Sequence, residues 1–507
     1  MSTANKRDDR YARVLELCSE TLDGRRLIVV SNRGPVEHRL NQDGQIQVRR
    51  GSGGLVTAFS SLMRDVDFTW VSSAMGEGDR RVWDESHGDS IQPQIPGSRV
   101  SIRYVNTPRR VYHKFYNTLC NPLLWFLQHY MWSPSYTPTI DGTVHDAWEN
   151  GYVPVNRSFA EAVVAEGRAA SGSVCVMVHD YHLYLVAQQV REALPSAIIE
   201  HFVHIPWPSP EYWELIPGYI RTSICQSLCA SDIVGFQTKR DGHNFIQSCQ
   251  EFLPGAEVDY AACTVTLEGR QTLVRSYPLS INVEEVRRIA ASSRTQEYER
   301  QLQGARTEKI IVRVDRAEPS KNILRGFRAY EALIKQHTEL QGKVSFLAFL
   351  VPSRTHIRQF QRYLEEIQQL AESINGECGT PGWQPIQLFM ENNYTQAVAG
   401  MKLYDVLLVN AVIDGMSMVA KEGPVINDNN GVLVLSGATG AYPQLAKGVL
   451  PVAAADVQGT MEAMYQALTM SDEERERRST ILTESIERED ITHWFQRQFQ
   501  DINALAK

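Results

Sequence analysis

Short apolar runs alternate with longer amphipathic segments along most of this 507-residue chain. The runs are rich in β-branched residues and stop at His, Asp, Arg, Ser or Gly. They are LIVVSNR from residue 27, VCVMVHDY from 174, AIIEHFVHIP from 197, KIIVRVDR from 309, VSFLAFLVPSR from 344, DVLLVNAVIDG from 405 and GVLVLSG from 431. Helical patterns lie between them, for example over Ile323 to His337 and Ile357 to Ile374. This alternation predicts a parallel α/β protein, in which ligands bind beyond the carboxyl ends of the strands.

The length suggests two large domains or three smaller ones. An apolar fraction of 43% and a charged fraction of 22% are ordinary for a globular protein. A boundary is expected near Tyr277, where a Pro-containing segment follows a strand and a helical pattern begins again. A final helix, roughly Asp490 to Ala506, carries Trp494 and Phe495 and is expected to pack back across the first domain.

Charge and cysteine content narrow the class of protein. A formal net charge of −8 argues against a general nucleic-acid binder but leaves room for a small basic cleft. The eight cysteines form no CxxC pair, so structural zinc is not expected, and free thiols fit a reducing compartment. The start, MSTANKRDDRYARVLEL, is too charged for a signal peptide, and the apolar runs are far shorter than a membrane span. The sequence therefore predicts a cytoplasmic protein without a membrane segment.

Two motif pairs in the first half of the chain could bind a ligand. SNRGP at 31–35 is followed by GSGGL at 51–55, and a glycine-rich turn lets backbone amides approach a phosphate beside the cation of Arg33. VHDYHL at 178–183 and HIPWP at 204–208 place His and Asp at two strand ends. Those side chains suit sugar hydroxyls or phosphate, or they are satisfied structural groups. A metal site would need three or four converging ligands, and HExxH spacing is absent.

Two further motifs lie in the second half. In RVDRAEPSKN at 313–322, Arg316 and Lys321 flank a turn between a strand and a helix, which suits a diphosphate or is a solvated basic turn. In DGMSMVAKE, Asp414 ends a strand and Gly415 permits a tight turn. The next residues are expected to open a helix that presents free amides, with Glu422 about two turns in on the same face.

In order and spacing, these strings resemble the trehalose-6-phosphate synthase family of retaining glycosyltransferases. The resemblance runs from about Leu27 to Trp494 and includes SNRGP, GSGGL, VHDYHL, HIPWP, GFQT, VDRAEPSK, VPSRT, INGECGTPGW, DGMSMVAKE and GVLVLS. It implies the α/β GT-B fold, two Rossmann-like domains with parallel sheets facing across a cleft. The acceptor-binding domain would span 1–283, the nucleotide-sugar-binding domain 284–484, and a helix at 485–507 would cross back to the first domain.

The implied reaction transfers glucose, with retention, from a nucleotide-diphosphate glucose (UDP- or GDP-glucose) to glucose 6-phosphate, without metal or cofactor. The family's catalytic residues correspond to Asp180, His204, Arg316, Lys321 and Asp414. The acceptor would contact Arg33, Tyr116, Trp125, Asp180 and Arg354, with the two arginines on its phosphate. The donor would contact Gly53, Gly54, Arg316, Lys321, Asp414, Met416, Ser417, Met418, Val419 and Glu422, with Glu422 on the ribose and His204 on the glucose.

The chain departs from the family pattern at several places near the expected donor site. The usual DGMNLVAKE is DGMSMVAKE, the usual arginine before its Asp is Ile413, SKG is SKN at Asn322, YPIGI is YPLSI at Ser280, and Lys402 stands for an arginine. The donor nucleotide and the oligomeric state stay open. Two alternatives also remain: a related transferase with a changed donor or acceptor, such as a pseudo-glycosyltransferase joining cyclitols, and a sugar-phosphate-binding regulator that has lost catalysis.

Overall fold

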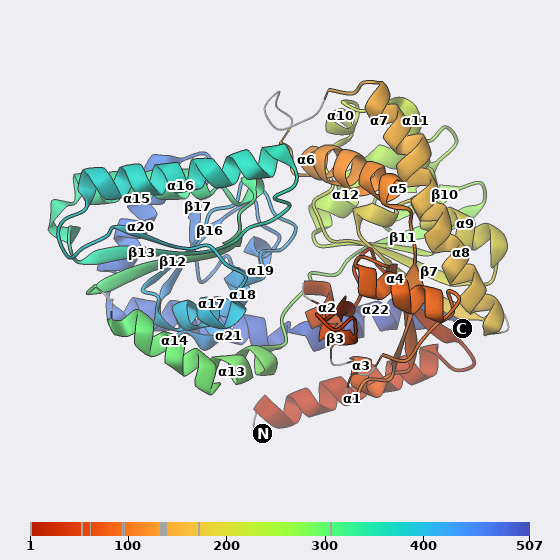
Figure 1. Cartoon of the computed structure of the whole chain (residues 1–507), viewed down its shortest axis with the longest axis horizontal. Helices are drawn as coiled ribbons and strands as arrows, with labels where there is room; N and C mark the ends of the chain where they lie inside the picture. Colours follow the sequence, from red (N-terminus) through yellow and green to blue (C-terminus); the bar gives the residue numbers. More distant parts are fainter. Residues whose placement is uncertain are drawn as a thin grey trace. The chain divides into compact units, whose positions relative to one another are not determined.

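The computed structural model describes residues 3–51, 54–60, 62–93, 95, 97–131, 139–170, 173–304 and 307–506. The chain divides into two compact units (Figure 1): unit 1 comprises Met1–Pro278 and Thr492–Lys507, and unit 2 comprises Leu279–Ile491. The division thus falls after Pro278 and after Ile491, whereas the sequence analysis placed it after residues 283 and 484.

Unit 1 is built on a nine-stranded sheet in the order β5-β4-β1-β6-β7-β8-β11-β10-β9. The strands from β5 to β11 in that order are parallel, and β10 and β9 complete the sheet as antiparallel neighbours. Their bounds are β1 Arg26–Val30, β4 Phe68–Ser73, β5 Val100–Val105, β6 Val174–His179, β7 Ile198–Val203, β8 Ile233–Phe236, β9 Glu257–Asp259, β10 Thr264–Leu267 and β11 Arg270–Ser276. The sheet order brings the ends of β1, β6 and β7, with their predicted site motifs, side by side.

A separate hairpin and the helices surround this sheet. The hairpin consists of β2 (Val36–Leu40) and β3 (Ile46–Arg50). The helices are α1 Thr3–Thr21, α2 Gly54–Phe59, α3 Leu62–Asp65, α4 Glu77–Glu85, α5 Arg109–His113, η1 Lys114–Trp125, α6 Phe126–Gln128, α7 Gly142–Ala147, η2 Trp148–Tyr152, α8 Val153–Ala169, η3 Tyr181–Leu183, α9 Val186–Ala193, α10 Pro210–Trp213, α11 Gly218–Leu228, α12 Lys239–Phe252 and α22 Ile491–Ala506.

Unit 2 contains a parallel six-stranded sheet in the order β14-β13-β12-β15-β16-β17. Its strands are β12 Lys309–Arg316, β13 Val344–Val351, β14 Ile386–Phe389, β15 Val406–Val409, β16 Val432–Ser436 and β17 Leu450–Val452. Its helices are α13 Val283–Ala290, α14 Ser293–Gly304, η4 Pro319–Lys321, α15 Ile323–Gln336, η5 Thr338–Leu340, α16 Arg358–Cys378, α17 Tyr394–Leu403, α18 Val419–Ile426, α19 Tyr442–Leu445, α20 Val457–Thr469 and α21 Asp472–Arg488.

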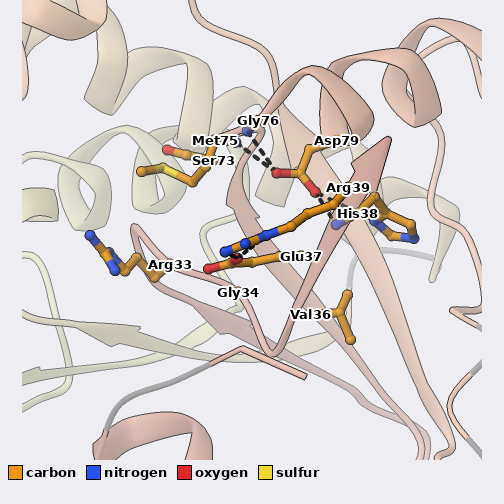
Figure 2. A pocket seen from close by; sticks show the side chains of 10 residues that line it. All are labelled: Arg33, Gly34, Val36, Glu37, His38, Arg39, Ser73, Met75, Gly76 and Asp79. Atoms are coloured by element: carbon orange, nitrogen blue, oxygen red, sulfur yellow. Dashed lines mark hydrogen bonds and ion pairs between the residues drawn. The ribbon is translucent and has the colours of Figure 1, made fainter. Parts of the chain in front are cut away.

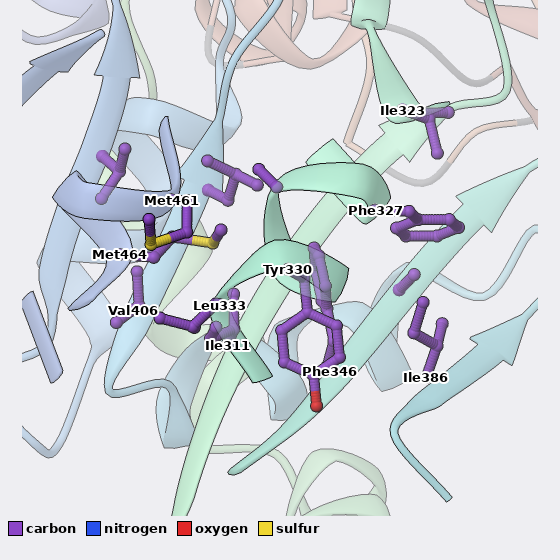
Figure 3. Packing of buried hydrophobic residues seen from close by; sticks show 14 of the residues in the cluster. Ile311, Ile323, Phe327, Tyr330, Leu333, Phe346, Ile386, Val406, Met461 and Met464 are labelled. Carbon is purple, nitrogen blue, oxygen red and sulfur yellow. The ribbon is translucent and has the colours of Figure 1, made fainter. Parts of the chain in front are cut away.

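Helices cover both faces of the unit 2 sheet. On one face, α15, α16 and α20 pack on the strands through a core that includes Phe327, Tyr330, Phe346 and Met464 (Figure 3). On the other face, α13, α17, α18 and α21 form a second core. Because both faces are covered, the strands are apolar along nearly their whole length, and polar residues gather where the strands end.

The last helix, α22, packs on unit 1. Trp494 is 1% exposed, and its indole nitrogen donates to the carbonyl of Tyr277 at 3.1 Å. Asp501 accepts a hydrogen bond from the Tyr277 hydroxyl at 2.5 Å, and the ring of Phe59 meets those of Trp494 and Phe495 edge-on. An aromatic contact surface of this kind stabilises the helix against the sheet.

The α/β class and the strands expected from the apolar runs are confirmed, as β1, β6, β7, β12, β13, β15 and β16. All eight cysteines are free thiols. Among the described residues, no helix combines the length and apolar character needed to cross a membrane.

Candidate active site

The carboxyl end of β12 carries two of the predicted cations on either side of an acidic residue. Arg316 ends β12, and Lys321 ends η4 just before α15. Between them, Glu318 is almost wholly buried, and its Oε1 lies 3.1 Å from Arg316 Nη1. Burial alone would raise the pKa of Glu318, but the charges of Arg316, Arg354 and Lys321 outweigh burial and lower it to about 2. Glu318 is therefore an anion at physiological pH.

Arg354 joins this group from the neighbouring strand. It follows β13, which pairs with β12 so that Arg316 lies opposite Val351. Its Nη1 lies 2.7 Å from Glu318 Oε1, and its guanidinium sits 5.1 Å from the centre of the Phe360 ring. Arg354 has a left-handed backbone, with φ of 48°, and its side chain is only 10% exposed. The structure thus brings Arg316, Lys321 and Arg354 together at one edge of the unit 2 sheet.

Asp414 lies beside Lys321 at the same edge. Its Oδ2 forms an ion pair with Lys321 Nζ and accepts a hydrogen bond from Ser417 Oγ at 2.5 Å. Gly440 stabilises the turn at Asp414, because its amide donates a hydrogen bond to the Asp414 carbonyl at 3.0 Å. A Cβ on Gly440 would lie 1.7 Å from the Gly415 oxygen, so no larger residue fits without a shift of this loop.

The helix after Asp414 begins later than the sequence analysis expected. Ser417 has a left-handed φ of 69°, and α18 starts only at Val419. Glu422 therefore lies in the first turn of α18, and the expectation that it sits two turns into a helix opened by Asp414 was wrong. The left-handed turn at Ser417 leaves the amides of 416–419 without an acceptor among the described residues, so this loop can donate to an anion.

Glu422 has a perturbed acidity. Burial raises its pKa to about 7, and a hydrogen bond from Tyr394 acts in the opposite direction. The sequence analysis missed Tyr394, which begins α17 and has no motif around it. The carboxyl of Glu422 therefore changes its charge within the physiological range.

In unit 1, Asp180 and His204 meet beyond the ends of β6 and β7. The His204 amide donates to Asp180 Oδ1 at 3.3 Å, and Asp180 has a left-handed φ of 75°. His204 Nε2 lies 3.2 Å from Nδ1 of the buried His179. Burial lowers the pKa of His204 to about 3, so this imidazole is neutral and can form hydrogen bonds with a sugar without bringing a charge.

Arg33 follows β1 and lines a pocket of about 240 Å³ with residues of the β2–β3 hairpin and α4. Figure 2 shows Arg33 on one side of this pocket, apart from the paired Glu37 and Arg39. Gly54 begins α2. The predicted contact Gly53 lies outside the described residues.

Tyr116 and Trp125 come from the π-helical segment η1, which the sequence analysis did not anticipate. The Tyr116 ring stacks with the rings of Tyr112 and His182, at centroid distances of 5.6 and 5.8 Å. Trp125 is 1% exposed and stacks on His129 at 4.2 Å. Their role in acceptor binding stays a prediction, as does that of every other site residue.

Within the described ranges, no group of three or more His, Cys, Asp or Glu side chains is arranged to hold a metal ion. The polar edge of unit 2 carries three cations, Arg316, Lys321 and Arg354. Glu318, which organises them, was missed because its sequence neighbours alone do not reveal that it faces Arg354.

Comparison with known proteins decides the family. Residues 25–504 match the family model for glycosyltransferase family 20. The chain belongs to glycosyltransferase family 20. The resemblance expected from its motifs is confirmed, and the family membership covers both units.

Curated relatives carry trehalose-phosphate synthase names. A trehalose-6-phosphate synthase of Mycobacterium avium is 31% identical over 95% of both chains. An alpha,alpha-trehalose-phosphate synthase [UDP-forming] A of Dictyostelium discoideum is 30% identical over 94% of this chain. A bifunctional trehalose-6-phosphate synthase/phosphatase of Thermoproteus tenax is 32% identical over 92% of it. The chain spans 62% of the length of each of these last two relatives.

Solved structures show the same fold. A UDP-forming alpha,alpha-trehalose-phosphate synthase from Burkholderia xenovorans, in complex with glucose-6-phosphate, matches with a TM-score of 0.81 and 26% identity, covering 94% of this chain and 99% of that one. An E. coli structure bound with UDP-2-fluoro glucose matches with a TM-score of 0.80, the same identity and the same coverage. The predicted GT-B class, with two Rossmann-like units, is confirmed.

Proposed function

We propose that this chain transfers glucose from UDP-glucose to glucose 6-phosphate with retention of configuration, giving α,α-trehalose 6-phosphate. The observation that carries the proposal is the cationic edge of unit 2, where Arg316 and Arg354 pair with Glu318 and Lys321 pairs with Asp414. The names of the UDP-forming relatives and the ligands in the two solved structures support UDP-glucose and glucose 6-phosphate as the substrates. A cytoplasmic location stays a prediction.

On the donor side, Arg316 and Lys321 bind the diphosphate and stabilise the charge that develops as UDP leaves. Preorganised cations suit this task because they need not reorient when the bond breaks. Lys321 is held by Asp414, and the amides at 416–419 are open to the donor. Asp414 and His204 bind the donor glucose, while Glu422 binds the ribose. Gly53 and Gly54 cover the donor phosphates.

On the acceptor side, Arg33 and Arg354 bind the phosphate of glucose 6-phosphate, Tyr116 and Trp125 line the pocket, and Asp180 contacts the sugar. The glycosidic bond between C1 and the donor phosphate oxygen breaks, and C1 bonds to the acceptor hydroxyl on the same face. The acceptor proton passes to the oxygen of the leaving phosphate. No side-chain nucleophile takes part, so trapping a covalent glucosyl-enzyme at an Asp or Glu would overturn this mechanism.

A donor and acceptor panel tests the function. The protein is incubated with UDP-, GDP- and ADP-glucose and with cyclitol donors, each with phosphorylated and unphosphorylated acceptors. Nucleotide release and product mass are then measured. We expect UDP release that depends on glucose 6-phosphate and a product with the mass of trehalose 6-phosphate. Binding without turnover in every combination would instead indicate a regulatory protein, and turnover with cyclitols alone would indicate a changed substrate.

A further inference from the structure

Two arginines assigned to different substrates share one carboxylate oxygen. Glu318 Oε1 lies 3.1 Å from Arg316 Nη1 and 2.7 Å from Arg354 Nη1, and it also accepts a hydrogen bond from Ser353 Oγ at 2.8 Å. The other oxygen, Oε2, is buried and has no hydrogen-bond partner in the described part of the chain. Within the described residues, the ion pairs and the side-chain hydrogen bond of this carboxylate therefore all involve one atom, Oε1.

Strand pairing produces this convergence. β12 and β13 are parallel neighbours, and the Ala317 amide donates to the Val351 carbonyl at 2.9 Å, just beyond the last paired residues. The backbone of Glu318 is fixed in turn, because its amide donates to the Arg316 carbonyl at 2.7 Å. The side chain of Glu318 is thereby directed toward the residues that follow β13.

The burial of the Glu318 carboxylate is unfavourable for the stability of the fold. A buried carboxylate with an unpaired oxygen loses much of its hydration, and burial of an ion pair is often no better than an apolar contact. What Glu318 supplies is orientation, because a planar guanidinium anchored at one nitrogen has its remaining donors set in direction. Arg316 has no other protein partner among the described residues, and its side chain is 54% exposed, so its remaining donors are open to a ligand.

We propose that Glu318 is a positioning residue that sets the spacing of Arg316 and Arg354 and so couples binding of the donor diphosphate to binding of the acceptor phosphate. This inference rests on the proposed function, which places Arg316 on the diphosphate and Arg354 on glucose 6-phosphate. The first anion to bind orders one arginine and, through the shared oxygen, also the other. The second anion then binds with a smaller ordering cost. By thermodynamic linkage, the enhancement is the same in both directions.

The test is the variant Glu318→Gln, which keeps the shape of the side chain and an acceptor oxygen but removes the charge. Calorimetry measures binding of UDP alone, glucose 6-phosphate alone, and each in the presence of the other. Because the variant loses the two ion pairs that hold Arg316 and Arg354 in position, we expect both dissociation constants to rise about tenfold. We also expect each ligand to strengthen binding of the other in the native protein and to have no such effect in the variant.

Two further variants separate positioning from general stability. Asp405→Asn removes another buried carboxylate of unit 2, one that pairs with Arg475 at 3.3 Å and is not part of the site. It should lower the melting temperature but leave both dissociation constants and their coupling unchanged. Glu318→Asp keeps the charge but shortens the reach by one methylene, so it should abolish the coupling as Glu318→Gln does. It also serves where the glutamine variant does not fold.

The outcomes are distinguishable. Glu318 variants that fold, bind both ligands and keep the native coupling would overturn the inference, and so would a native protein whose two ligands bind independently. A native protein that binds both ligands with coupling but releases no UDP would refute the proposed transfer, while the coupling lost in Glu318→Gln would still support the positioning role. A native protein that binds neither ligand would overturn both.

Discussion

Replacing Arg316 with alanine should separate catalysis from stability. The Arg316 side chain is 54% exposed, and its ion pair with Glu318 spans 3.1 Å. Pairs with an exposed member contribute little, because solvent screens the charges and ordering a long side chain costs entropy. Glu318 also keeps Arg354 and Ser353 as partners after the substitution. We therefore expect the free energy of unfolding to change by no more than about 0.5 kcal/mol.

The effect on turnover should be far larger. If Arg316 stabilises the charge that develops on the leaving diphosphate, its loss resembles removal of a preorganised donor from a site of developing negative charge. Such a loss costs about 3–4 kcal/mol in the transition state, so kcat should fall about 100- to 1000-fold. Arg316 is not assigned to the acceptor, so the dissociation constant for glucose 6-phosphate alone should rise only through the link to Arg354.

The assay combines initial rates of UDP release, calorimetric binding of glucose 6-phosphate and denaturant unfolding. Arg477→Ala is the matched control, because Arg477 is also 54% exposed and also pairs with one glutamate, Glu474, but lies on α21 away from the site. The control should change none of the three quantities appreciably. An Arg316→Ala protein whose acceptor binding weakens as much as its turnover falls would refute the leaving-group role. A loss of more than about 2 kcal/mol in unfolding free energy would refute the stability argument.

Three further predictions follow from individual contacts. Because burial raises the pKa of Glu422 to about 7, UDP affinity should increase from about pH 6 to about pH 8 as the carboxylate ionises and accepts hydrogen bonds from the ribose hydroxyls. Glu422→Gln should flatten this pH profile, measured by calorimetry, and a pH dependence that persists in the variant would exclude Glu422 as its cause. The same raised pKa means that folded Glu422 keeps a proton that the unfolded chain has lost, so its contribution to stability declines between pH 4.5 and about 7. Gly440→Ala should displace the Asp414 loop and weaken UDP binding, since its Cβ would lie 1.7 Å from the Gly415 oxygen, and unaltered UDP binding would contradict the close approach. Trp494→Ala should reduce the unfolding free energy of unit 1 by about 3–5 kcal/mol in denaturant titrations, because the buried indole and its hydrogen bond to Tyr277 are lost. A change below about 1 kcal/mol would show that packing of α22 contributes little to the stability of unit 1.

The sequence was sufficient for the regular part of the fold because buried parallel strands and amphipathic helices leave strong local patterns. β12 and α15 begin at the residues expected, Lys309 and Ile323. The π-helical segment η1 left no such pattern, since Pro122 lies inside it and its aromatic residues point to several neighbours. Its conformation depends on packing against other elements, which local periodicity does not encode.

For the site, the sequence predicted which charged residues follow the strands, but it did not predict which side chains those residues contact. The motif around Arg316 and Lys321 predicted a turn between a strand and a helix that suits a diphosphate, and in the structure both residues flank such a turn. Glu318 and Arg354 are 36 residues apart in sequence, and their pairing depends on β12 and β13 being neighbours in the sheet. The late start of α18 depends on the left-handed backbone of Ser417, which a pattern of apolar and polar residues does not report.

Three of the departures from the family pattern, at Asn322, Ser417 and Lys402, have local structural explanations. Asn322 replaces the usual glycine at a left-handed φ of 60°, a conformation that asparagine tolerates better than most residues, and its amide donates to the carbonyls of Asn410 and Ala454. Ser417 replaces asparagine at a left-handed φ of 69°, where the strain is offset by its bond to Asp414. Lys402 keeps a positive charge and pairs with Glu299 at 2.6 Å, while Ile413 is buried in the core. None of these changes removes Arg316 or Lys321 from its ion pair with Glu318 or Asp414, so the side chains proposed to bind the donor diphosphate keep their places.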